Sequence, residues 1–73
     1  MHPVQSRMAR AALKLGVRDI ATMAKVSTQT ISRIEAGEDA RERTLDDIQR
    51  AYEGAGAKFI TDDDWVGVLV KAG

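Results

Sequence analysis

The side chains best suited to chemistry in this 73-residue chain are four polar residues near its middle. The spacing of Ile31 and Ile34 predicts a short helix over residues 28–36, with these two isoleucines facing inward. The outer face of that helix then carries Thr28, Gln29, Ser32 and Arg33. Glutamine and arginine can each bond two atoms of a planar group at once, so this face is suited to recognition by hydrogen bonding.

Covalent and metal chemistry have few candidates here. The chain has no cysteine, and His2 is its only histidine. The sequence also contains no recognisable Ser-His-Asp set, Cys-His pair or glycine-rich phosphate loop. The run Asp62-Asp63-Asp64 does not match the spacing of a calcium loop and is interpreted as a solvated turn. We expect no enzyme activity, no metal and no cofactor.

The charges are unevenly distributed, although the net charge is zero. Residues 1–36 carry a net charge of +4, and residues 37–73 carry −4. Such a split favours one basic working face and an acidic remainder. The apolar stretches are short and no signal-peptide pattern is present, so we expect a cytoplasmic protein that does not enter a membrane.

A single domain over residues 1–73 is expected from the length, with four helices and a hairpin to position the polar face. Pro3 suits the first position of a helix, and Gly16 interrupts the helical pattern. Ser27 is a good N-cap for the helix that follows it, and Thr44 with Asp47 resembles a capping box. These signals predict helices over residues 3–15, 17–24, 28–36 and 45–54, joined between the last two by a charged loop over residues 38–43.

The C-terminal residues are rich in strand formers and predict a β-hairpin over residues 58–70. Its second arm is apolar on both faces, so one face can pack on the helices while the other needs a cover. A chain this short is marginally stable and has no disulfide, which makes a second subunit the expected cover. The residues proposed for that dimer interface are Trp65, Val66, Val68 and Val70.

The segment from Val17 to Gly37 resembles the helix-turn-helix of the Cro/CI family, also called the XRE family. Two steeply crossing helices need a small residue at their contact, here Ala21, and apolar pins, here Ile20, Val26, Ile31 and Ile34. The similarity extends from about Ser6 to Gly56, and the sequence at residues 55–60 is similar to short single-domain members with a C-terminal β-hairpin. The resemblance implies a mainly α fold: a four- to five-helix lambda-repressor-like DNA-binding domain with a C-terminal β-hairpin.

The resemblance also implies roles for individual residues. Base reading falls on Thr28, Gln29, Ser32 and Arg33, where Gln29 can pair with adenine and Arg33 with guanine. Phosphate contacts fall on the start of the second helix and on the loop after the third, at Arg18, Ser27, Arg41 and Arg43. The family's ion pair between the first helix and the end of the recognition helix falls on Arg10 and Glu35.

Three positions depart from the family pattern. Val17 stands where many members have glutamine, which removes one side-chain phosphate contact. Lys25 stands where many have glycine; if that position needs a positive φ, lysine costs on the order of 1 kcal/mol. Acidic residues also surround the expected phosphate-binding arginines, at Glu38, Asp39 and Glu42.

Two functions follow from these patterns, and the sequence leaves both open. The first is a sequence-specific transcriptional regulator, a repressor, that binds a palindromic double-stranded DNA operator as a homodimer. The second is a protein-interaction module, such as an antitoxin or an anti-activator, that keeps the helix-turn-helix fold and binds a protein partner through its acidic half.

Overall fold

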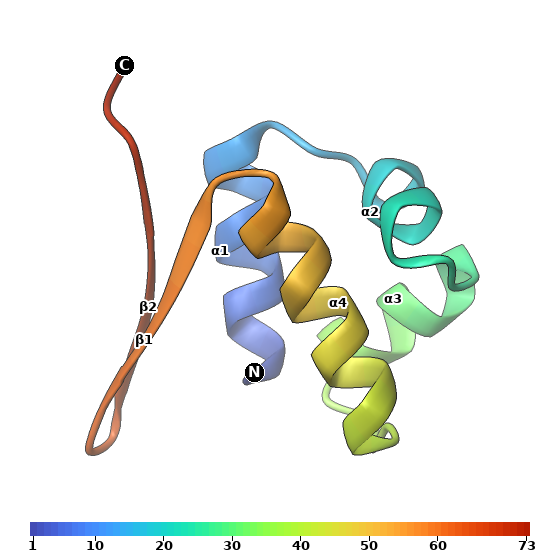
Figure 1. Ribbon diagram of the computed structural model, residues 1–73. Coiled ribbons are helices and arrows are strands. Elements are labelled where there is room, and N and C mark those ends of the chain that lie inside the picture. Colours follow the sequence, from blue (N-terminus) through green and yellow to red (C-terminus); the bar gives the residue numbers. More distant parts are fainter.

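Four helices precede a two-stranded antiparallel hairpin in the computed structural model, which describes all residues from 1 to 73 (Figure 1). The fold is mainly helical, as predicted. No helix is long and apolar enough to cross a membrane. The elements are α1 (Pro3–Leu13), α2 (Val17–Ala24), α3 (Thr28–Glu35), α4 (Glu42–Gly54), β1 (Ala57–Asp62) and β2 (Trp65–Val70).

The start of α4 differs from the prediction. The helix begins at Glu42, three residues before the expected start, and Arg41 is its N-cap without a side-chain capping bond. The capping box proposed for Thr44 and Asp47 is therefore wrong. Glu42 lies in the first turn, where a carboxylate is favoured by the helix dipole, and no helix breaker separates it from Leu45.

The ends of α1 and α3 also fall earlier than expected. Helix α1 stops at Leu13 because Lys14 adopts the left-handed conformation, with φ of 57°. Helix α3 stops at Glu35, and Gly37 follows with φ of 91°. A glycine at positive φ just after a helix end is the expected stop signal.

A small apolar core joins the helices to the base of the hairpin. Helix α2 packs against both α3 and α4. Three of the four apolar pins, Ile20, Ile31 and Ile34, are buried, and Val26 is half-buried against them. Ala21 is 3% exposed, which fits the need for a small residue where α2 approaches its neighbours. The buried apolar residues are Ala9, Ile20, Ala21, Ala24, Ile31, Ile34, Ile48, Tyr52 and Ala57.

The hairpin stands beside α1, on the side of the molecule away from α2 and α3 (Figure 1). Its strands pair from Ala57 opposite Val70 to Asp62 opposite Trp65, so Asp63 and Asp64 form a two-residue turn. Asp63 has φ of 52°, a conformation that aspartate tolerates in such turns.

A buried glutamine ties the hairpin to α1. Gln5 is 1% exposed, and its Nε2 donates to the backbone oxygens of Ile60 and Gly67, each at 3.0 Å. Its Oε1 accepts from the backbone N–H of His2 at 2.8 Å. All the polar atoms of this side chain thus have partners, which a buried amide requires. The contact fixes the hairpin against the first turn of α1.

The left-handed backbone of Lys25 leads to a prediction about stability. Lys25 ends α2 with φ of 58°, so a side chain stands where glycine would be unstrained. We expect Lys25→Gly to raise the free energy of unfolding by about 1 kcal/mol, measured by urea denaturation. Lys25→Ala is the control, because it removes the charge and keeps the Cβ. Equal stabilisation by both variants would assign the gain to charge instead of backbone conformation.

Candidate nucleic-acid interface

Helix α3 is held by one face and exposes the other. Ile31, Ile34 and Glu35 are buried, at 1%, 3% and 8% exposure. The four side chains predicted to read bases are all exposed: Thr28, Gln29, Ser32 and Arg33. Their spacing of one, three and one residues places them on a common stripe of the helix. The structure therefore presents a row of hydrogen-bonding groups over a fixed apolar base.

Ser27 has a structural role at the start of this helix. Its Oγ accepts a hydrogen bond from the backbone N–H of Thr30 at 3.1 Å and lies 2.8 Å from Thr30 Oγ1. The expected N-cap is therefore present. The serine is also exposed, so the same hydroxyl lies at the surface where a phosphate contact was predicted.

Arg33 and Arg41 line a common hollow beside α3, although eight positions separate them in the chain. The hollow has a volume of about 330 Å³ and is bounded by Thr30, Arg33, Ile34, Asp39, Ala40, Arg41 and Thr44. Neither guanidinium makes a hydrogen bond or an ion pair within the chain; the one ion pair is elsewhere. Asp39 shares this lining and reduces the positive potential there.

The early start of α4 changes the setting of two predicted phosphate contacts. Arg41 and Arg43 are not in a loop but at the N-cap and in the first turn of a helix. Positive side chains are unfavourable there, by about 0.3–1 kcal/mol each, because they add to the positive end of the helix dipole. Glu42 lies between them and offsets part of this potential. Two arginines beside the free N–H groups of a helix start still favour an incoming anion.

Arg18 does not line the hollow that Arg33 and Arg41 share. It is exposed in the first turn of α2. At the same helix end, Asp19 Oδ2 accepts from the backbone N–H of Gly16 at 2.7 Å. This carboxylate lowers the positive potential of the helix end where a phosphate was expected to bind.

The end of α3 is anchored by an ion pair to α1. Glu35 accepts hydrogen bonds from Arg10 Nε at 2.9 Å and Arg10 Nη2 at 2.7 Å. The resemblance implied this pair, and the structure contains it. Arg7 also donates to the backbone oxygen of Glu35. Two neighbouring arginines of α1 therefore hold the side chain and the main chain of the same residue.

Two buried hydroxyls extend this anchor to α4. Ser6 Oγ donates to Glu35 Oε2 at 2.7 Å and lies 2.7 Å from Tyr52 Oη. A serine has one proton, and here it goes to the carboxylate, so the Tyr52 hydroxyl donates to Ser6. The sequence analysis missed Ser6 and Tyr52 as partners. The available signal was their position on the inner faces of two helices, since a buried hydroxyl needs a partner.

The anchor shifts the ionisation of its members. Burial alone would raise the pKa of the Glu35 carboxyl, but hydrogen bonds from Arg10 and Ser6 and the nearby positive charges hold it below its ordinary value of 4.5. The hydrogen bond to Glu35 raises the pKa of Arg10. Burial raises the pKa of the Tyr52 hydroxyl. Glu35 therefore remains a carboxylate at 8% exposure, because its partners compensate for the lost hydration.

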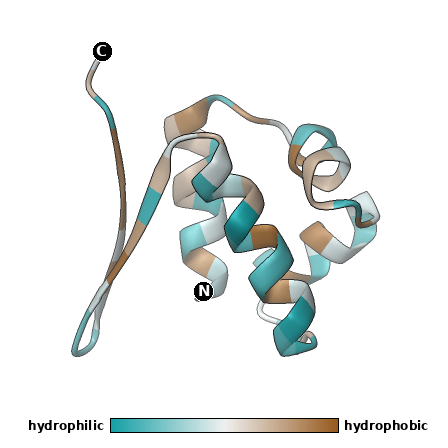
Figure 2. Ribbon diagram, in the orientation of Figure 1, coloured by the Kyte–Doolittle hydropathy of each residue, from teal (hydrophilic) through white to brown (hydrophobic).

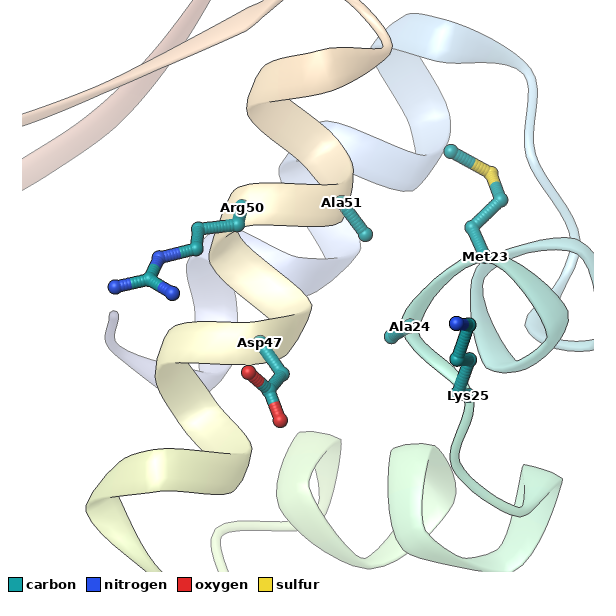
Figure 3. Close-up of a pocket in the computed structure, with 6 residues that line it drawn as sticks. All are labelled: Met23, Ala24, Lys25, Asp47, Arg50 and Ala51. Atoms are coloured by element: carbon teal, nitrogen blue, oxygen red, sulfur yellow. The ribbon is translucent and has the colours of Figure 1, made fainter.

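A second hollow, of about 380 Å³, lies between α2 and α4 (Figure 3). Met23, Ala24 and Lys25 line one side, and Asp47, Arg50 and Ala51 line the other, with the Arg50 guanidinium directed away from α2. None of the predicted site residues lines this hollow. No cluster of three or more histidine, cysteine or acidic side chains is arranged to hold a metal ion.

The four residues predicted for a dimer interface divide between two environments. Val66 and Val68 are half-buried, and Val68 packs against the core. Trp65 and Val70 are exposed, at 79% and 39%. Strand alternation turns Val66, Val68 and Val70 towards the helices and leaves Trp65 alone of the four on the outer face, so these residues do not form one surface.

The strength of the anchor can be measured with a double-mutant cycle. Arg10→Met leaves the buried Glu35 carboxylate without its cation, so we expect a loss of about 3 kcal/mol in the free energy of unfolding. Glu35→Leu is the other single variant of the cycle, and Arg10→Met with Glu35→Leu removes both charges and should recover most of the loss caused by Arg10→Met alone. Arg50→Met, at an exposed arginine of α4, should change stability by less than about 0.5 kcal/mol. Additive losses in the double variant would contradict the coupling.

The lowered pKa of Glu35 predicts an acid-dependent contribution to stability. A group whose pKa is lowered by folding stabilises the native state above its ordinary pKa of 4.5, and this contribution is lost as the pH falls through the folded value. The wild type should therefore exceed Glu35→Gln in unfolding free energy at pH 7, and the gap should narrow towards pH 3. Denaturant titrations at pH 7, 5 and 3 measure it. A gap that stays constant with pH would contradict this role of Glu35.

Comparison with protein-family models gave no match to this chain, and comparison with curated proteins gave none either.

Proposed function

We propose that this chain binds duplex DNA sequence-specifically, with α3 entering the major groove, and that it represses transcription. In this proposal α2 and α3 are the two helices of a Cro/CI-type helix-turn-helix, within a lambda-repressor-like fold. The observation that carries it is the single exposed polar stripe of α3 above a buried apolar face. The major groove is about 12 Å wide and admits one helix in this way.

The side chains on the stripe support base reading. Gln29 can form paired hydrogen bonds with adenine, and Arg33 can do so with guanine O6 and N7. Both side chains are exposed, and neither is engaged in a hydrogen bond within the chain. Thr28 and Ser32 are short enough to let the helix approach the base edges closely.

Arg41 and Arg43 are suited to bind the phosphates that flank the groove. The free N–H groups at the start of α4 add to their charge, which is the usual setting for a phosphate. Arg41 shares a hollow with Arg33, so one phosphate contact would lie next to one base contact. Asp39 in the same hollow would lower the affinity for any sequence.

A repressor needs only to occupy its site, and one α3 reads only a few base pairs. We therefore propose a dimer on a palindromic operator, with the two α3 helices in successive major grooves about 34 Å apart.

Selection from a randomised duplex pool tests the proposal. Enrichment of a two-fold symmetric site is expected, with log affinity falling steeply as log salt rises. A folded sample that enriches no sequence would rule out sequence-specific DNA binding. It would favour the other candidate, a protein-interaction module, in which the acidic half binds a partner.

Three arginine variants separate base contacts from phosphate contacts on the selected site. Arg33→Ala should relax the preference at one base pair, worth about 1–3 kcal/mol, while Arg41→Ala should weaken all sequences and reduce the salt slope by about 1. Arg50→Ala is the matched control, since it removes the same charge from the exposed part of α4. Equal effects of all three variants would indicate only non-specific charge attraction.

A further inference from the structure

The outer face of the hairpin is apolar at its centre and exposed. Strand alternation and register turn Lys58, Ile60 and Asp62 of β1 outward, together with Trp65, Gly67 and Leu69 of β2. Ile60, Trp65 and Leu69 are 45%, 79% and 52% exposed. Figure 2 shows hydrophobic residues along both strands, beyond the helical part of the molecule. Exposed apolar side chains gathered on one sheet face indicate a surface that becomes covered.

Gly67 shapes the middle of this face. A Cβ at this position would lie 3.1 Å from Ile60 Cδ1 and Cγ1, so the Ile60 side chain lies across the strand over the glycine. The face is therefore low and smooth at its centre. Only Trp65, near the turn, and Leu69, near the open end, stand on either side along β2.

The two ends of the hairpin carry opposite charges. Lys58 and Lys71 lie at the open end, and Asp62, Asp63 and Asp64 lie at the turn; all five are exposed. Two such surfaces that pack face to face in antiparallel orientation attract each other at both ends, because each basic end then lies over an acidic one.

We propose that a second copy of this chain docks on the outer face of the hairpin, face to face and antiparallel, about a two-fold axis at Ile60 and Gly67. Such an axis sets Lys58 over the partner's Asp62 and Trp65 over the partner's Leu69, and each contact occurs twice. Ile60 meets the partner's Ile60 at the centre, where each isoleucine lies over its own Gly67. A parallel arrangement would instead bring aspartates against aspartates.

The size and charge of the face set the affinity and argue against a lipid surface. One face of a hairpin with two six-residue strands has a smaller area than the roughly 800 Å² that each partner buries in a stable interface. We therefore expect a dissociation constant on the order of micromolar or weaker. The aspartates at the turn would be repelled by anionic lipid. The association requires no DNA and can be tested separately from the role of α3.

Charge-swapped variants test this interface. Lys58→Glu with Lys71→Glu gives one acidic hairpin, and Asp62→Lys with Asp64→Lys gives one basic hairpin. Each variant alone should dimerise at least tenfold more weakly than the wild type at low salt, because like charges then meet at both ends. An equimolar mixture should restore association, because each acidic end then meets a basic one. Sedimentation equilibrium over a concentration series measures all four samples.

Trp65 is the only tryptophan, so its fluorescence reports directly on the outer face. Its emission should shift to shorter wavelength as the wild type associates. The control, Lys25→Glu with Arg50→Glu, makes the same charge change at exposed sites at the end of α2 and on α4 and should dimerise like the wild type. A monomer at every concentration, a dimer unaffected by the swaps, or association without a shift in Trp65 emission would each overturn this interface. A protein that stays monomeric could still select a half-site through α3, so failure of this interface and failure of DNA reading by α3 remain distinguishable.

Discussion

The carboxylate of Glu35 is the point on which the arrangement of the helices depends. It lies at the end of α3, nearly buried, and is bonded by Arg10 and Ser6 of α1, with Tyr52 of α4 behind Ser6. Apolar packing alone lets helices slide and rotate by small amounts, because the hydrophobic effect has no direction. Hydrogen bonds to one charged group do have direction, so they fix the rotation of α3 and hence the side chains it exposes.

The parts of the fold that could be predicted are those set by local chemistry. The bounds of α2 follow from Gly16 and from the apolar spacing, and Ser27 caps α3 as serine commonly does. The start of α4 was misjudged because Thr44 offers a good cap in isolation. In the folded chain Arg41 turns the backbone three residues earlier, and helix propensity over residues 42–44 then suffices.

The parts that could not be predicted are contacts between distant residues. Nothing around Gln5 shows that its amide will bond the main chain of a hairpin more than 50 positions away. The stripe on α3 was predictable from spacing, but the hollow that brings Arg41 beside Arg33 depends on how the loop after α3 turns. The hairpin was predictable, whereas its inner and outer faces were not, because β2 is apolar on both.

The first turn of α1 joins the whole molecule. Three consecutive residues there bind three different places: Gln5 the hairpin, Ser6 the Glu35 carboxylate and Tyr52, and Arg7 the main chain at the end of α3. A change of backbone conformation at residues 5–7 would therefore loosen the hairpin and α3 together, although it leaves the sequences of both elements untouched.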